Sequence, residues 1–182
     1  MNSVPSRRTP YDDDYATCAE TRAEVIVYPG SLLPYEITRR LQLEPTYSIA
    51  AGEERPSKSG GKTIAKTSVW SLSSEGQTGS LDLRRHLDWL LAQLTPQAEG
   101  LRRLQEIPGV RMTVNCAWYS KLGHGGPTLW PEQMQLLAEL NLECNQDRVE
   151  RDPKWRRLLI QLGSRCGDLL ERSWRVQRMA KR

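Results

Sequence analysis

Apolar and polar residues alternate strictly over positions 109–119, and this is the clearest pattern in the chain. Such an alternation predicts an antiparallel strand with one covered face and one mostly polar face. In the segment 21–28 apolar residues occupy both faces, which predicts a strand in the middle of a sheet. Weaker patterns predict further strands over 46–51, 67–73 and 142–149. The apolar positions of the clearest strand are Val110, Met112, Val114, Cys116 and Trp118.

Apolar residues spaced three and four positions apart predict the helices. One helix spans residues 34–43, where a proline suits the first turn and a following Glu-Pro pair stops the helix. A longer helix runs from Ser80, its expected N-cap, to Pro108, with a kink or restart at Thr95-Pro96. A short helix with apolar residues on one side begins at Trp130.

In chain order these elements are strand, helix, strand, strand, helix, strand, helix and strand. The first six match the split βαβ arrangement of ferredoxin-like folds, in which helices cover one face of an antiparallel sheet. We therefore expect an α+β domain with an antiparallel sheet of four to five strands. The segment 52–65 is rich in Gly, Ser, Pro and Lys, and we expect it to be a mobile hairpin loop.

Charge divides the chain into a body and a tail. Residues 1–150 carry 16 Lys and Arg against 19 Asp and Glu, whereas residues 151–182 carry 10 against 3. A body of net charge −3 is thus joined to a basic tail, residues 151–182, of net charge +7. This division, and the scarcity of aliphatic residues at the start, predict a disordered leader over 1–18, an α+β domain over 19–150 and a basic helical extension over 151–182.

The basic tail has the pattern of an amphipathic helix. Its apolar residues form one helical stripe from Trp155 to Trp174, and Asp152-Pro153 suits a helix start. Such a helix contacts nucleic acid, an anionic membrane or an acidic protein groove, or it docks on its own domain or pairs in a homo-oligomer. The sequence leaves these alternatives open. The residues expected to carry the contact are Arg156, Arg157, Arg165, Arg172, Arg175 and Arg178.

A second candidate site is the glycine-rich turn that follows the alternating strand. The backbone amides of such a turn can form an anion-binding nest, to which Lys121 and His124 would add positive charge. The alternative, which we favour, is that the glycines only provide the positive φ values of a tight turn. The residues of this candidate site are Lys121, Gly123, His124, Gly125 and Gly126.

Other residues that often carry chemistry have structural interpretations in this sequence. His86 lies near the apolar stripe of its helix, where we favour a packed histidine over a general base. The tryptophans are expected to fill the core of a chain that has no Phe, rather than to stack nucleobases. Gly61-Lys62-Thr63 matches only the end of a phosphate-binding loop, because Pro56 stands where the first glycine should be.

The cysteines and the targeting signals narrow the class of protein. The four cysteines are far apart in the sequence and lack the short spacings of metal sites, so we expect reduced thiols, no metal and no cofactor. The first eight residues lack the apolar stretch of a secretory signal, and no run approaches the roughly 20 apolar residues of a membrane span. We therefore expect a cytoplasmic protein with no membrane span.

Short pieces of the sequence, taken in order, match one known family. They are Glu36-Ile37-Thr38, Leu41 to Pro45, Lys66 to Leu72, His86-Leu87 before Leu90-Leu91, and Gly125 to Leu129 before Pro131-Glu132. Together they resemble the bacterial domain-of-unknown-function family 4279 over residues 21–149. The segment 142–147 is more polar than the family's last strand, and the basic tail lies outside the family pattern. The resemblance implies a domain boundary but no activity and no catalytic residues.

Three functional hypotheses follow from these observations. The leading one is a non-enzymatic interaction protein whose tail helix binds a protein partner or a second copy, as in an immunity- or inhibitor-like role. The second is a nucleic-acid-binding protein that uses the basic tail and the loop containing Arg55, Lys58, Lys62 and Lys66. The third is an enzyme without a recognisable motif.

Overall fold

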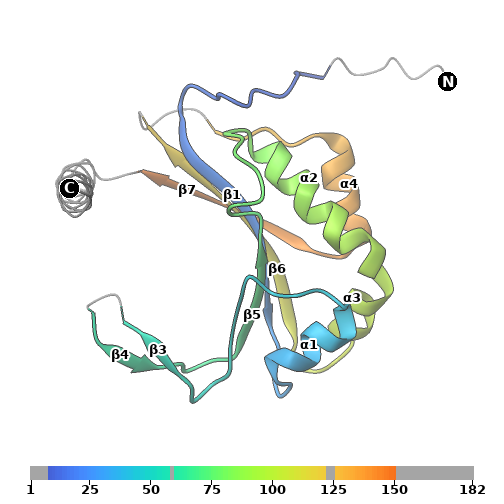
Figure 1. Cartoon of the computed structure of the whole chain (residues 1–182). Coiled ribbons are helices and arrows are strands. Elements are labelled where there is room, and N and C mark those ends of the chain that lie inside the picture. The colour runs from blue at the N-terminus through green and yellow to red at the C-terminus, as the bar shows by residue number, and fades with distance from the viewer. Residues whose placement is uncertain (1–7, 58–59, 122–125, 151–182) are drawn as a thin grey trace, which may run out of the picture. The chain divides into compact units, whose positions relative to one another are not determined.

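The computed structural model describes residues 8–57, 60–121 and 126–150 of the chain. Five strands form a sheet with the order β2-β5-β1-β6-β7, and β3 and β4 form a separate two-stranded ribbon (Figure 1). The strands are β1 (Cys18–Tyr28), β2 (Tyr47–Ile49), β3 (Glu54–Pro56), β4 (Lys62–Ile64), β5 (Val69–Ser73), β6 (Arg111–Ser120) and β7 (Glu143–Glu150). The expected class, an α+β domain with a sheet of four to five strands, is confirmed.

The long strand β1 occupies the centre of the sheet, as the apolar residues on both of its faces predict. It pairs antiparallel with β5 on one side and with β6 on the other, and β2 pairs antiparallel with β5. Strand β7 runs in the same direction as β6, beside which it lies (Figure 1). Asn145 of β7 donates to Thr113 and Asn115 of β6 at 3.0 and 3.3 Å, which joins the two strands through their side chains.

The helices of the described residues lie on one side of the five-stranded sheet (Figure 1). They are α1 (Pro34–Leu41), α2 (Leu83–Leu94), α3 (Ala98–Gln105) and α4 (Pro131–Glu139), with a 3₁₀ turn at Thr95–Gln97 between α2 and α3. This turn is the break that Thr95-Pro96 predicts. The hydrophobic core fills the space between the helices and the sheet, and its members include Val25 of β1, Trp70 of β5 and Leu87 of α2.

Two local expectations are corrected by the structure. Asp82, not Ser80, is the N-cap of α2, because its carboxylate accepts the Arg84 N–H at 3.0 Å. Ser80 instead accepts the N–H of Asp82 at 2.9 Å and shapes the turn before the helix. The segment 52–65, expected to be a loop, contains the paired strands β3 and β4, with residues 58–59 outside the described residues.

The ends of the chain differ in what the structure describes. Residues 8–17, expected to belong to a disordered leader, hydrogen-bond to the turn before α2 and to its first turn, so that expectation does not hold for them. Residues 1–7 and the basic tail, 151–182, lie outside the described residues. Among the described residues no helix is long and apolar enough to cross a membrane.

The close approach of two turns at one end of β1 gives a stability prediction. A Cβ on Gly30, whose φ is +62°, would lie 2.8 Å from the carbonyl carbon of Gly109. Gly52 has a φ of +92° and open space around it. Gly30→Ala should therefore lower the free energy of unfolding by roughly 2 kcal/mol more than Gly52→Ala, since only the first adds a backbone clash to the positive-φ penalty. Urea unfolding of both variants measures this, and equal losses would contradict the predicted close approach.

Candidate functional site

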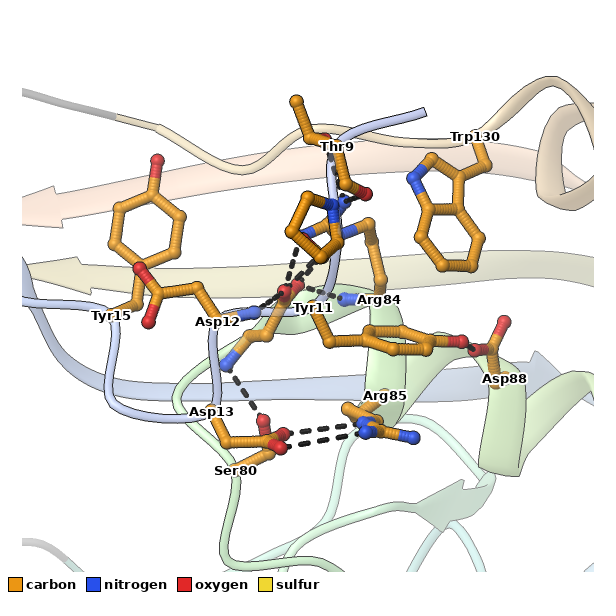
Figure 2. Close-up of polar contacts among 12 residues, drawn as sticks. Thr9, Tyr11, Asp12, Asp13, Tyr15, Ser80, Arg84, Arg85, Asp88 and Trp130 are labelled. Atoms are coloured by element: carbon orange, nitrogen blue, oxygen red, sulfur yellow. Dashed lines mark hydrogen bonds and ion pairs between the residues drawn. The ribbon is translucent and has the colours of Figure 1, made fainter. Parts of the chain in front are cut away.

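A cluster of polar contacts joins residues 9–13 to α2 (Figure 2). Residues 9–13, which we call the N-terminal strap, cross the first turn of this helix. The Arg84 side chain donates to the carbonyl oxygens of Thr9 and Pro10 at 3.0 and 2.7 Å. The Asp12 N–H donates to the Asp82 carboxylate at 2.8 Å. The strap is therefore held by the same two residues that form the start of α2.

Arg84 and Asp82 form a buried ion pair at the centre of this cluster. The Arg84 Nε lies 2.9 and 3.1 Å from the two Asp82 carboxylate oxygens, and both side chains are 4% exposed. The guanidinium also lies beside two rings that contact each other, 5.4 Å from the centroid of Tyr11 and 4.9 Å from that of Trp130. A planar guanidinium can stack and donate in several directions at once, which an ammonium group cannot do.

The electrostatics of the pair follow from these contacts. Burial would raise the pKa of the Asp82 carboxyl, but hydrogen bonds from the Arg84 side chain and from the Asp12 and Arg84 N–H groups hold it below its ordinary value. The hydrogen bond to Asp82 raises the pKa of Arg84. Both groups are therefore charged in the folded protein at neutral pH.

The remaining side chains of the cluster complete a network rather than point into open space. Burial, and the hydrogen bond that the Tyr11 hydroxyl donates to Asp88, raise the pKa of Tyr11 to about 12. Gln133 of α4 donates to the Asp88 carboxylate at 2.6 Å and to the Arg84 carbonyl at 3.0 Å. The network therefore links the strap, α2 and α4, and its polar groups are engaged in binding the strap.

His86 lies in a second buried polar chain, next to a serine hydroxyl. Its Nδ1 is 2.9 Å from the Ser74 Oγ, and its Nε2 is 2.8 Å from the carbonyl oxygen of Ser80. A carbonyl only accepts, so Nε2 carries the hydrogen and Nδ1 accepts from Ser74. Ser74 also accepts the Ala23 N–H at 2.9 Å and is fully buried, which leaves its hydroxyl out of reach of a substrate. The packed histidine that the sequence favoured fits this arrangement.

The side of the sheet opposite the helices carries a different set of side chains. We call this surface the open face; it lies over β1 and β6, and its defining residues are Arg22, Ile26, Tyr28, Arg111, Asn115 and Tyr119. These residues point away from the core, because their strand neighbours Ala23, Val25, Val27, Val114 and Cys116 are fully buried in it. Arg111 is exposed and the other five are partly exposed.

Two arginine–tyrosine pairs dominate the open face. The Arg22 guanidinium donates to the Tyr119 hydroxyl at 3.2 Å and lies 5.5 Å from the centroid of its ring. Arg111 is paired across the strands with Tyr28, and its guanidinium lies 5.5 Å from that ring centroid. Such pairs hold flexible arginines in one orientation over flat apolar surfaces.

The structure places few of the residues that the sequence singled out as sites. Lys121 and Gly126 of the glycine-rich turn are described, and their backbones bond to Thr17 and Tyr15. Gly123, His124 and Gly125 lie outside the described residues, as do the six tail arginines. Neither predicted site can therefore be built from the structure.

Three features were missed by sequence reasoning. They are the strap network, the arginine–tyrosine pairs of the open face, and a contact between Cys116 and Cys144. The arginine–tyrosine pairs could have been found from the sequence, because the alternating strand has Arg, Tyr and Asn on its polar side. Aromatic and arginine side chains on such a face are typical of contact surfaces. The described residues hold no group of three or more His, Cys, Asp or Glu that could bind a metal.

The buried ion pair leads to a stability prediction. Arg84→Ala leaves the Asp82 carboxylate buried without its partner and releases the strap, so it should lower the free energy of unfolding by about 3 kcal/mol. The matched control is Arg85→Ala, which removes an exposed ion pair with Asp13 and a contact with the Tyr11 ring but leaves no buried charge unpaired, so it should cost much less. Chemical unfolding monitored by tryptophan fluorescence measures both, and similar losses would show that the buried pair has no special role.

His86 gives a prediction for pH. Burial lowers the pKa of His86, although its hydrogen bond to Ser80 opposes the shift. Below about pH 6.5 the imidazole of His86 therefore binds a proton in the unfolded chain but not in the folded chain. The free energy of unfolding should fall as the pH drops from that value towards the lowered pKa. The carboxylate of Asp82, whose pKa is lowered, adds a separate loss at more acidic pH.

The two contributions can be separated by substitution. His86→Asn should remove the decline that begins near pH 6.5 and leave the loss at acidic pH. Urea midpoints measured from acidic to neutral pH test this. An unchanged decline in the His86 variant would assign it to another group.

Comparison with known proteins places the chain in one family. A family model described as Domain of unknown function (DUF4279) matches residues 19–149, which is more than half of the chain. No curated protein and no solved structure matches the sequence. The match includes β1 except for Cys18 and extends through most of β7, whereas the strap precedes the match. The chain therefore belongs to the DUF4279 family, as its resemblance implied.

Proposed function

We propose that this protein is a binding module that recognises a protein partner through the open face of its sheet. The observation that carries the proposal is the pair of arginine–tyrosine stacks, Arg22 with Tyr119 and Arg111 with Tyr28, on the side of the sheet opposite the helices α1 to α4. Tyrosine and arginine are enriched in protein interfaces, and they dominate the residues whose loss costs most binding energy.

The surroundings of the two stacks support a preformed contact surface. Ile26 lies between them on the central strand and supplies an apolar centre, and the Asn115 side chain nearby is held in place by Asn145 of β7. The backbone of β1 is paired on both sides, and each arginine side chain contacts a tyrosine, so the surface loses little conformational freedom on binding. A rigid surface of this kind favours recognition of a structured partner.

Charge favours a protein over a nucleic acid at this surface. Arg22 bonds to Glu20 at 3.2 Å, and Glu24 lies opposite Asn115 on the same face. The two arginines are thus balanced by carboxylates, whereas a surface that binds phosphates carries a net positive charge. Nucleic-acid binding through the basic tail remains the second hypothesis and rests on its net charge of +7.

We also propose a ferredoxin-like topology for the domain, with β7 added at one edge. The order β2-β5-β1-β6, with antiparallel neighbours throughout, supports this assignment. The expectations of a bacterial source, a cytoplasmic location and a tail that contributes to partner binding belong to the same proposal and rest on the sequence alone.

Charge reversal on the open face tests the proposed function. Arg22→Glu/Arg111→Glu should weaken binding of the partner, isolated by affinity capture and then purified, by at least about tenfold, since two contact residues are lost. The matched control is Arg39→Glu/Arg40→Glu on α1, which makes the same charge change at exposed positions and should bind normally. Titration calorimetry gives both affinities, and light scattering shows whether the partner is a second copy.

A parallel experiment separates the second hypothesis. Full-length protein and protein truncated after Val149 are titrated with labelled single-stranded DNA and RNA at two salt concentrations. In the calorimetric experiment, equal affinity of the partner for Arg22→Glu/Arg111→Glu and for Arg39→Glu/Arg40→Glu would contradict the open-face proposal. Tight, salt-sensitive nucleic-acid binding that disappears on truncation would replace it with the tail hypothesis.

A further inference from the structure

Two cysteine thiols from neighbouring strands are in contact in the described part of the chain. The Sγ of Cys116 in β6 and the Sγ of Cys144 in β7 are 3.7 Å apart. Cys116 is fully buried, whereas Cys144 is partly exposed, so a reagent in solution reaches Cys144 first. The two cysteines are 28 residues apart in the sequence, so the fold, and not the local chain, brings their thiols into contact.

The geometry allows the two sulfurs to become bonded. A disulfide places its sulfurs about 2 Å apart, so the two atoms must approach by roughly 1.7 Å. β7 is the last strand in the sheet order, and of the described strands only β6 pairs with it. A strand held on one side can shift towards its neighbour more easily than one in the middle of a sheet.

The contact also distinguishes the two thiols chemically. The hydrogen bond from Cys116 lowers the pKa of Cys144, although burial opposes this. The same hydrogen bond, together with burial, raises the pKa of Cys116. Cys144 is thus the thiol that ionises more readily, and the thiolate is the form that attacks a disulfide.

We infer that Cys116 and Cys144 form a reversible dithiol–disulfide pair, in which Cys144 is the attacking thiol and Cys116 the resolving thiol. The oxidant is a small-molecule disulfide of the glutathione class. This inference goes beyond the proposed function and does not depend on it. Its consequence is a covalent link between β6 and the edge strand β7, from which the chain continues into the basic tail.

The reaction proceeds in two exchange steps. The Cys144 thiolate attacks one sulfur of glutathione disulfide, the S–S bond of that molecule breaks, and one glutathione thiolate leaves and takes up a proton. Cys116 then loses its proton to solvent and attacks the Cys144 sulfur, which breaks the mixed disulfide and releases the second glutathione. The protein loses two protons and two electrons in total, and the small disulfide is reduced to two thiols.

Mass spectrometry of the full chain tests the inference. The protein carries Cys166→Ser, which removes the cysteine that lies outside the described residues. After treatment with glutathione disulfide, the native protein should lose two hydrogen masses, peptide mapping should place the link between Cys116 and Cys144, and dithiothreitol should reverse it. Cys18 is buried and is expected to stay unmodified, which makes it an internal control.

Single substitutions assign the two roles. Cys116→Ser should accumulate a glutathione adduct on Cys144, because no resolving thiol remains, whereas Cys144→Ser should gain neither adduct nor link. Brief alkylation of the unsubstituted native protein, which requires no core substitution, should label Cys144 before Cys116. Failure of the link to form, a link through Cys18, or faster labelling of Cys116 would overturn the inference.

Discussion

In the described part of the chain, helices cover one face of the sheet, and the alternation of side chains along β1 determines what both faces carry. Ala23, Val25 and Val27 are fully buried against the helices. Ile26 and Tyr28 occupy the alternate positions of the strand and point to the open face. Because the side-chain period of a strand is two, a shift of one residue would exchange the faces. The register that builds the core therefore also places the arginine–tyrosine pairs on the open face.

A second constraint is the buried ion pair of Asp82 and Arg84, which lies on the helical side of the sheet. Asp82 caps α2, and Arg84 neutralises it while holding the N-terminal strap by carbonyl oxygens. Burial of an ion pair is tolerated only when further hydrogen bonds satisfy both partners. The strap supplies these bonds, which explains why a segment with few aliphatic residues is ordered against the domain.

The strands and helices could largely be predicted from the sequence, because hydrophobic period and proline position act locally. The alternating segment 109–119 corresponds to β6, and the break at Thr95-Pro96 corresponds to the 3₁₀ turn between α2 and α3. The family assignment could likewise be made from short pieces of sequence in order.

Contacts between distant segments could not be predicted in the same way. The strap contains two aspartates, one tyrosine and no aliphatic residue, and in isolation it has the composition of a disordered segment. Its order depends on Arg84, which lies more than 70 residues later in the chain. The contact of Cys116 with Cys144 depends in the same way on the crossover through α4, and the basic tail lies outside the described residues. Local periodicity carries no information about such pairs.

The most direct test of the account is side-chain footprinting of the protein with and without its bound partner. Hydroxyl-radical labelling reports the solvent exposure of Tyr28 and Tyr119 on the open face and of Tyr35 and Met134, which are exposed on helices. The account predicts that partner binding protects the first two tyrosines and leaves the helical pair as reactive as before. Protection of Tyr35 or Met134 with unchanged labelling of the open face would contradict it.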